Sequence, residues 1–177
     1  MKPAANGLYL DGTLGAGGHA FGILSASAPD GRLLGLDVDP AALAIARQRL
    51  FPFRDRTIIQ QASYRQAPEI LESLGWGRVN GILLDLGVSS MQIDQPERGF
   101  SFMSDGPLDM RFNQEIGLSA GDLVNTRSES EIADILWQFG EERYSRRIAR
   151  AIIAARPIHT TRELAAVVKA AVPGYRS

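Results

Sequence analysis

Short apolar runs alternate with segments of helical periodicity along the first half of the chain. The apolar runs predict β-strands, and the segments whose apolar residues recur with helical spacing predict helices. Alternation of strand and helix predicts an α/β fold built on a parallel, doubly wound sheet. The run over 79–87 is apolar throughout, which predicts a strand buried on both faces. The other predicted strands are 7–11, 32–39 and 57–62, and the predicted helices between the strands are 19–28, 40–50 and 68–74.

The second half of the chain has a different pattern. Residues 88–114 are irregular and rich in glycine, serine, aspartate and proline, and a loop of this length is usually functional or disordered. Only helical patterns follow this loop, over 128–140, 141–155 and 160–172. The first and the last of these helices begin with capping-box sequences.

The turn after the first strand, LDGTLGAGGH, is rich in glycine. Gly12, Gly15, Gly17 and Gly18 allow positive φ and a close approach of a ligand to the backbone. The helix that follows points free N–H groups at the same place. A tight turn without a ligand is the alternative, but so many glycines cost chain entropy without an obvious structural need.

Two ligand classes compete for this loop. A dinucleotide site needs a G-x-G-x-x-G frame and an acid about 20 residues further on. Asp37 meets the second requirement, but the glycine frame does not match. Adenosylmethionine sites share the ribose-binding acid and carry another acid at the end of the first strand, here Asp11. Because a carboxylate attracts an ammonium or sulfonium group and repels a pyrophosphate, the pattern favours adenosylmethionine.

Several segments resemble those of the bacterial RsmH (MraW) family, and the resemblance runs along nearly the whole chain. They are LDGTLGAGGH, GLDVDP, GILLDLGVSS, QIDQPERGFSFMSDGPLDMR and FGEERYSRRIARAI. The resemblance implies an α/β fold, a Rossmann-like class I adenosylmethionine-dependent methyltransferase sheet with a helical insertion domain. It implies N4 methylation of a cytidine of 16S ribosomal RNA in the small-subunit decoding region. Residues 1–113 would then be the first part of the methyltransferase domain with its active-site loop, and residues 114–177 a helical, RNA-binding insertion.

Carried over residue by residue, the resemblance implies contacts to the cofactor S-adenosyl-L-methionine from the glycine loop, the strand ends and the long loop. Tyr64 stands where the family usually has phenylalanine, and a tyrosine ring can still stack on adenine. Without the resemblance, His19 would be a helix-start residue and Gln92 a solvated loop residue. The implied cofactor-binding residues are Gly17, Gly18, His19, Asp37, Tyr64, Asp85 and Gln92.

Methylation of an exocyclic amine needs a hydrogen-bond acceptor that localises the lone pair and takes the proton. The candidate catalytic acceptors are Asp85, at the end of the fourth strand, and Asp109, in the long loop; the alternative for Asp85 is a residue that caps the next loop. The absence of cysteine argues against methylation at C5 of a pyrimidine, which generally needs a covalent cysteine adduct.

In the long loop, Phe100, Phe102 and Phe112 either support a base taken out of its stack or anchor the loop to the core.

A basic stripe in EERYSRRIARAIIAAR suits phosphate contacts, although the formal net charge of the chain is only −1. Arg143, Arg146 or Arg147, and Arg150 follow at helical spacing and predict one exposed face. A solvated face paired with Glu141 and Glu142 is the alternative. The resemblance implies that this helical region helps to bind 16S ribosomal RNA within the small ribosomal subunit.

The composition limits the remaining possibilities. The chain has no cysteine and two histidines, so disulfides and a histidine-rich metal site are not expected. No apolar run approaches the length of a membrane span and no signal peptide is visible, so we expect a cytoplasmic protein. The oligomeric state is open, with a homodimer as one candidate.

Members of the family have a short segment before the first strand and run on well past residue 177. We therefore expect a chain truncated at its C-terminus, with the fourth strand at an exposed edge. A catalytically incomplete fragment that binds RNA or cofactor is the alternative function. A dinucleotide-dependent oxidoreductase is the more distant one.

Overall fold

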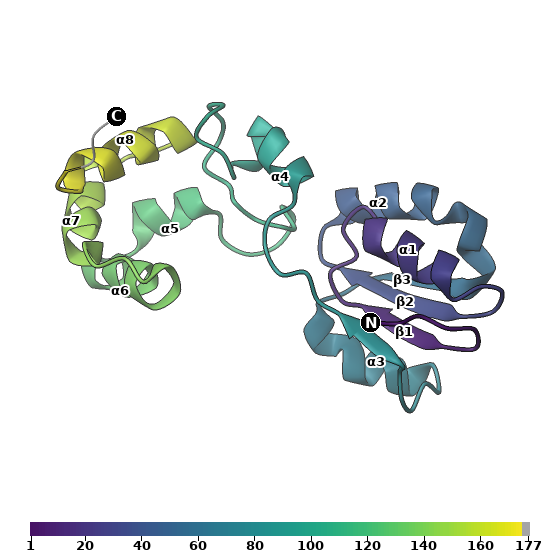
Figure 1. Ribbon diagram of the computed structural model, residues 1–177. Helices are drawn as coiled ribbons and strands as arrows, with labels where there is room; N and C mark the ends of the chain where they lie inside the picture. The colour runs from purple at the N-terminus through teal and green to yellow at the C-terminus, as the bar shows by residue number, and fades with distance from the viewer. Residues whose placement is uncertain (175–177) are drawn as a thin grey trace. The chain divides into compact units, whose positions relative to one another are not determined.

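A computed structural model describes residues 1–174 of the protein (Figure 1). The chain forms two compact units, Met1–Gly87 and Val88–Ser177. The helical subdomain predicted from residue 114 falls within the second unit, and residues 175–177 lie outside the described part of the chain. The predicted boundary between residues 113 and 114 follows the change in sequence pattern and stays a prediction.

The first unit is a parallel four-stranded sheet with helices on both faces (Figure 1). The strand order β3-β2-β1-β4 reverses the direction of winding between β1 and β4, and open α/β sheets bind ligands at such a point. The strands are β1 (Leu8–Asp11), β2 (Arg32–Asp37), β3 (Thr57–Gln61) and β4 (Gly81–Leu83). The helices are α1 (Gly18–Ala26), α2 (Pro40–Arg49) and α3 (Ala67–Ser73), with short 3-10 helices η1 (Phe51–Arg56) and η2 (Tyr64–Gln66).

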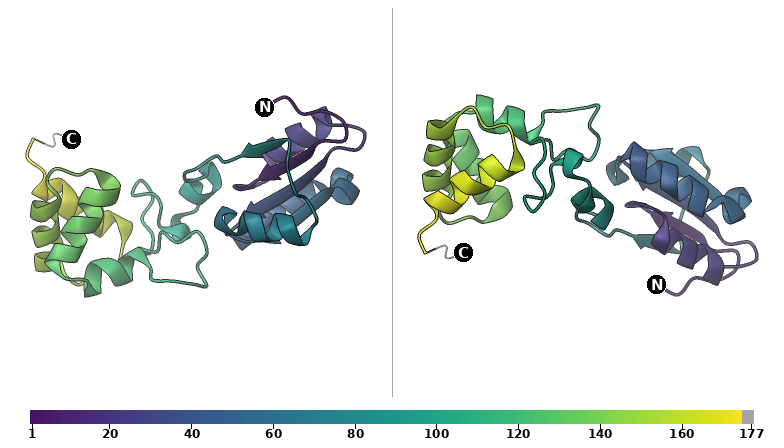
Figure 2. Two further views of the ribbon diagram at one scale, coloured as in Figure 1. Left: turned by 90° about the horizontal axis from the view of Figure 1, so that it is seen from below. Right: turned by 90° about the horizontal axis from the view of Figure 1, so that it is seen from above.

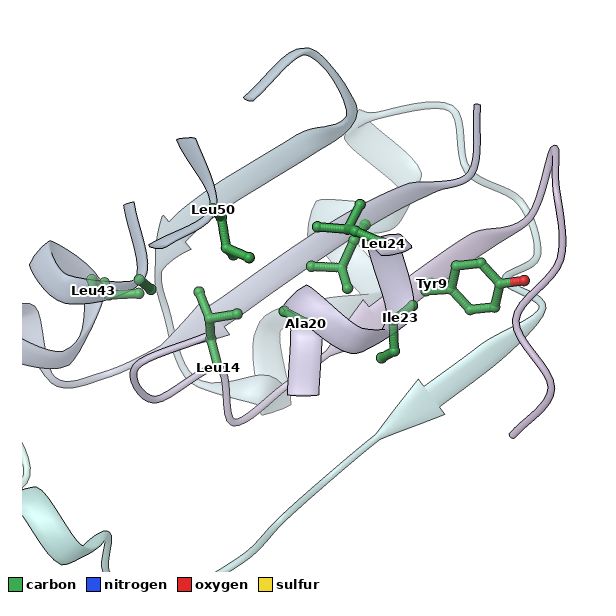
Figure 3. Close-up of a cluster of buried hydrophobic side chains, with 9 residues drawn as sticks. Tyr9, Leu14, Ala20, Ile23, Leu24, Leu43 and Leu50 are labelled. Atoms are coloured by element: carbon green, nitrogen blue, oxygen red, sulfur yellow. The ribbon is translucent and has the colours of Figure 1, made fainter. Parts of the chain in front are cut away.

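Alternate residues of the central strands are buried on opposite faces of the sheet. Tyr9 of β1 belongs to an apolar cluster with Leu24 of α1 and Leu43 of α2 (Figure 3). Leu10, the next residue of β1, belongs to a cluster with Trp76 on the face that α3 covers. Because neighbouring strand residues point to opposite faces, β1 is buried on both sides. The predicted doubly wound α/β sheet is confirmed.

The fourth strand differs from its prediction. β4 covers only Gly81–Leu83 and Ile82 is 57% exposed, so the prediction of a strand over 79–87 buried on both faces is wrong. Ile82 pairs in register with Leu10, on the α3 face of the sheet. Within residues 1–174, β4 pairs with β1 alone, so neither its outer edge nor this face is covered. The expected exposed edge is confirmed.

The helices α5–α8 of the second unit lie together at the green-to-yellow end of the chain (Figure 2). They share one apolar core. Ile148 and Ile152 of α7 are buried in this core, together with Ile158 between α7 and α8. The long loop is tied to the start of α8, because the N–H of Leu108 donates to the carbonyl of His159 at 3.0 Å. The helices are α4 (Ser90–Asp94), the 3-10 helix η3 (Pro96–Arg98), α5 (Ala120–Thr126), α6 (Glu129–Gly140), α7 (Ser145–Ala155) and α8 (Thr161–Ala171).

One helix of the second unit begins later than predicted, and the sequence pattern does not predict another. α7 begins at Ser145 and not at residue 141, because Glu141 has a left-handed φ of 50° that ends α6. Arg143 therefore precedes α7, and the prediction that it shares a helical face with the later arginines is wrong. The structure contains α5, which the sequence analysis did not predict, although Ser119 and Asp122 form a capping box at its start.

Replacing Gly35 of β2 tests how tightly the glycine loop packs on the sheet. A Cβ at Gly35 would lie 2.8 Å from side-chain carbons of Leu14 in that loop. Because Leu14 is buried and must shift, we expect G35A to lower the free energy of unfolding of the first unit by about 1–3 kcal/mol. The measurement is urea unfolding followed by the fluorescence of buried Trp76 in a W137F background.

The matched control is Gly22→Ala in α1. A Cβ there meets no atom within 4 Å, and alanine is the better helix former, so G22A should raise the free energy of unfolding by about 0.5–1 kcal/mol. A G35A variant that unfolds at the same urea concentration as G22A would contradict the packing of the loop.

Candidate functional site

The candidate site lies at the carboxyl ends of β1, β2 and β4, around the glycine loop Gly12–Gly17. The loop is bound to the strands on both sides through its backbone. The N–H of Gly12 donates to the carbonyl of Leu83 at 3.0 Å, and the N–H of Leu14 donates to the carbonyl of Leu36 at 2.9 Å. The predicted glycine loop thus sits at the point where the winding reverses.

Two glycines of the loop are required by its geometry. A Cβ at Gly12 would lie 2.5 Å from a side-chain carbon of Leu84 and 2.9 Å from Cβ of Tyr64, so only glycine lets these segments meet. Gly17 has a φ of 79° and is the N-cap of α1, in a conformation that residues with a Cβ rarely adopt. No side chain caps α1, so Gly18 and His19 in its first turn leave N–H groups available to a ligand.

Asp37 at the end of β2 holds the loop from one side. One oxygen of its carboxylate, Oδ2, accepts from the N–H of Gly15 at 2.7 Å, and Oδ1 accepts from the N–H of Asp39 at 2.9 Å. Asp39 in turn caps α2, as predicted, because its side chain accepts from the N–H of Ala41 at 3.0 Å. Each carboxylate oxygen has a second lone pair, so Asp37 can still accept from a ligand.

Asp11, the last residue of β1, is a deeply buried carboxylate beside the loop. Its side chain is 1% exposed; Oδ1 accepts from the N–H of Thr13 at 3.2 Å, while Oδ2 is buried without a hydrogen-bond partner. A buried carboxylate oxygen without a donor is costly. This oxygen is free to accept a hydrogen bond from a donor group of a ligand.

The environment of Asp11 changes its ionisation. Burial raises the pKa of Asp11 from 3.8 to about 6, against the lowering effects of the Thr13 N–H and of nearby His19. The charges of Asp37 and Asp85 make smaller contributions to the same rise. A positively charged ligand group would relieve both the burial and the repulsion, whereas an anion would increase the repulsion.

His19 and Asp85 meet at the open side of the loop. Nε2 of His19 lies 3.4 Å from Oδ2 of Asp85, and both side chains are mostly exposed. The N–H of Asp85 donates to Oγ1 of Thr13 at 2.7 Å. Tyr64, at the start of η2, is 41% exposed, so its ring is accessible to a flat ligand group. The site therefore combines carboxylates, bare helix amides and an accessible aromatic ring, which suits a cationic ligand with an aromatic part.

Two further predicted site residues belong to the second unit and are held by contacts within it. Gln92 is buried in a capping box at the start of α4, where its Oε1 accepts from the N–H of Ser89 at 2.9 Å. Asp109 receives two side-chain hydrogen bonds from Arg111, at 2.7 and 3.1 Å, and this guanidinium holds the pKa of Asp109 below its usual range. A carboxylate held in this way is a weaker proton acceptor than an exposed one.

A cavity of about 510 Å³ lies in the second unit, between the long loop and α8. Phe100, Phe102 and Met110 of the loop contribute to its apolar wall, and Arg162 and Lys169 of α8 contribute cationic groups. The ring of Phe100 also packs on that of Phe112, with centroids 5.5 Å apart. An apolar cavity with aromatic and cationic walls suits a flat ring next to an anionic group.

The predicted basic stripe is only partly on a helix. Arg146, Arg147 and Arg150 are exposed on α7, whereas Arg143 precedes it. Nε of Arg150 lies 3.6 Å from Oε1 of Glu129 on α6, and both side chains are exposed. Arg150 is thus paired with a glutamate of another helix, and not with Glu141 or Glu142 as the alternative had it.

Sequence reasoning missed two features of these sites. The hydroxyl of Thr13 bonds the backbone of a residue 72 positions away, and no sequence pattern announces such a contact. The cavity beside α8 depends on how the loop folds back on the helix, which the irregular pattern of 88–114 does not specify. The aromatic residues of that loop were the available signal.

Residues 1–174 contain neither a candidate metal cluster nor a candidate membrane helix. No group of three or more His, Asp or Glu residues in this range is placed to hold a metal ion. None of the helices in this part of the chain has the length and apolar character needed to span a membrane.

The raised pKa of Asp11 predicts how stability changes with pH. Between 3.8 and about 6 the folded unit keeps a proton on Asp11 that the unfolded chain has released, so the stability from this group is present below about pH 4 and is lost as the pH rises through about 6. D11N removes the titration. Its free energy of unfolding minus that of the wild type should rise by on the order of 2–3 kcal/mol from pH 4 to pH 7.

The measurement is urea unfolding at each pH, again followed through Trp76. D55N, which removes an exposed carboxylate of the same unit, is the control, and its difference from the wild type should stay flat. If the difference in free energy of unfolding between D11N and the wild type does not change with pH, burial does not raise the pKa of Asp11.

Comparison with known proteins gives the chain a family. The model described as the MraW methylase family matches residues 1–177. Three curated relatives, each named Ribosomal RNA small subunit methyltransferase H, are similar over almost the whole chain. The protein from Geotalea uraniireducens (strain Rf4) is 51% identical over 176 residues, covering 98% of this chain and 56% of the relative. That from Geobacter sp. (strain M21) is 50% identical with the same coverage, and that from Syntrophus aciditrophicus (strain SB) is 54% identical over 171 residues, 95% and 54% of the two chains.

The chain therefore spans about half the length of the curated relatives it matches. The match of the family model along its whole length agrees with the parallel sheet and with the glycine loop at the reversal of winding. The chain belongs to the MraW methylase family, and its first unit has the α/β Rossmann-like methyltransferase fold.

Proposed function

We propose that the protein is an S-adenosyl-L-methionine-dependent methyltransferase that methylates N4 of a cytidine of 16S ribosomal RNA in the decoding region of the small subunit. Family membership and the name of its relatives support ribosomal RNA methylation. The observation that carries the choice of cofactor is the buried, partnerless oxygen of Asp11 beside the bare start of α1.

The residues of the first unit fit this cofactor. The methionine end of adenosylmethionine carries an ammonium and a sulfonium group, and Asp11 has an oxygen that lacks a donor. Asp37 and Asp85 add negative charge at the same site, which disfavours the pyrophosphate of a dinucleotide. The site therefore favours adenosylmethionine over a nicotinamide dinucleotide.

The predicted cofactor-binding residues of the first unit then each have a role. Gly17, Gly18 and His19 would bind through the first turn of α1, and the free lone pairs of Asp37 would accept from ribose hydroxyls. Tyr64 would stack on adenine. Gln92 stays a predicted contact, since its side chain is engaged in the capping box of α4.

The bound cofactor supplies an electrophilic methyl group on a sulfonium. The protein must align the acceptor amine with that group and exclude water. Asp85 would accept a hydrogen bond from the amine N–H and take its proton, because its carboxylate is exposed beside the loop. Asp109, the other predicted acceptor, is the weaker candidate because Arg111 binds both of its oxygens.

The second unit would bind the RNA. The cavity lined by Phe100 and Phe102 has room for an RNA base, and Arg162 in its wall carries a charge that suits a flanking phosphate. The exposed arginines of α7 would add phosphate contacts. The partner would be 16S ribosomal RNA within the small subunit, and such an enzyme would work in the cytoplasm, where ribosomes assemble.

Calorimetric titration with adenosylmethionine and with NAD tests the cofactor. We expect binding of adenosylmethionine alone, with an affinity that falls below about pH 6 as Asp11 takes up a proton. D11N should weaken binding at pH 7.5 by about ten- to hundredfold, since it removes a charge-assisted hydrogen bond. D55N should bind like the wild type. Binding of NAD with no response to adenosylmethionine would contradict the proposal.

Transfer of a labelled methyl group to undermethylated small subunits tests the reaction itself. We expect label at N4 of a cytidine of 16S ribosomal RNA after digestion to nucleosides. Binding of the cofactor with no transfer would support a catalytically incomplete fragment instead.

Salt dependence of RNA binding tests the arginines of α7. Each phosphate interaction that a substitution removes should reduce the slope of log K against log salt by about 1. R146Q/R147Q should therefore bind the RNA more weakly and with a slope lower by about 1–2. R54Q, which removes an exposed arginine of the first unit, is the control and should leave the slope unchanged. An unchanged slope in R146Q/R147Q would show that these arginines of α7 do not contact the RNA.

A further inference from the structure

The position of Asp85 depends on few interactions. β4 ends at Leu83, two residues before Asp85, and the Asp85 side chain is 72% exposed. Its backbone N–H donates to Oγ1 of Thr13 at 2.7 Å, and its carboxylate lies 3.4 Å from the imidazole of His19. Both partners come from the glycine loop and the first turn of α1, so the loop itself determines where Asp85 lies.

Thr13 bonds both acidic residues, the carboxylate of Asp11 and the backbone of Asp85. Its N–H donates to Oδ1 of Asp11 at 3.2 Å, while its hydroxyl oxygen accepts from the N–H of Asp85. The two bonds run from the buried acid at the end of β1 to the exposed acid after β4. One residue thus fixes the spacing between the proposed ammonium-binding group and the proposed proton acceptor.

The glycine loop does not need the Thr13 hydroxyl to keep its own place. Gly12 is bonded to β4 and Leu14 to β2 through the backbone, and Asp37 binds the N–H of Gly15. These bonds are untouched when the hydroxyl is removed. The hydrogen bond that disappears is the one to Asp85, beyond the end of the edge strand.

We propose that Thr13 is a positioning residue for methyl transfer: its hydroxyl holds the backbone of Asp85 so that the carboxylate faces the cofactor and the acceptor amine. The inference rests on the proposed function, because it takes Asp85 to be the group that meets them. Thr13 touches neither the methyl group nor the amine and acts through Asp85.

The test compares T13V, which keeps the shape of the side chain but not the acceptor, with T13S, which keeps the hydroxyl. T57V is the control, since it removes another threonine hydroxyl bond of the first unit, from Oγ1 of Thr57 to the carbonyl of Phe53 at 2.9 Å. The first readout is hydrogen exchange of the Asp85 amide by NMR, which needs no ligand. The second is the affinity for adenosylmethionine by calorimetry.

In T13V we expect the Asp85 amide to exchange about three- to tenfold faster and adenosylmethionine to bind about three- to tenfold more weakly, as expected for the removal of one hydrogen bond. T13S and T57V should match the wild type in both readouts. Unchanged exchange at Asp85 in T13V would overturn the proposed hydrogen bond. Faster exchange with unchanged affinity would overturn the positioning role.

Failure of the proposed function can be distinguished from failure of the Thr13 inference. If the wild-type protein does not bind adenosylmethionine at all, the proposed function fails, and the exchange measurement still decides whether Thr13 holds Asp85.

Discussion

A buried carboxylate without a complete set of partners is the constraint around which the first unit is organised. Asp11 ends the central strand β1, which is buried on both faces of the sheet, and Asp11 itself is buried. Its pKa is raised to about 6 chiefly by burial, and one of its oxygens has no donor. Folding alone would favour an apolar residue there. A carboxylate kept at this place in spite of its cost is understandable as a binding group for a cation.

The surrounding residues hold the loop that such a ligand would contact. Asp37 binds the loop from β2, and Thr13 connects it to the segment after β4. The bonds reach both strands that flank β1, so the loop is fixed where the direction of winding reverses. A fixed loop loses little freedom when a ligand binds, and its carboxylates are already in place.

The sequence predicted the elements whose local pattern and tertiary packing agree. The strands at Asp11 and Asp37, the helix capped by Asp39 and the glycine loop all follow from short-range rules, and the structure confirms them. Asp11, Asp37 and Asp85 could be named because strand ends of a parallel sheet converge, whereas His19 and Tyr64 were named only through the resemblance to a known family. Their cofactor contacts themselves stay predictions.

The remaining features depend on interactions that the pattern does not encode. Ile82 lies in an apolar run, yet it is exposed because β4 has a neighbour on one side only among the described residues. Arg143 has helical spacing from Arg150, yet a single left-handed residue, Glu141, interrupts the helix. Asp109 reads as a free acid in the sequence, whereas in the structure Arg111 binds it. In each case a tertiary or backbone interaction overrides a local signal.

The most direct measurement is a titration of the Asp11 carboxyl carbon by NMR, with and without saturating adenosylmethionine. We expect a midpoint near pH 6 in the free protein, well above the ordinary value of 3.8, and a fall of the pKa toward that ordinary value when the cofactor binds. A midpoint that stays the same with the cofactor bound would show that Asp11 does not hold its cationic end, and the assignment of the site would be wrong.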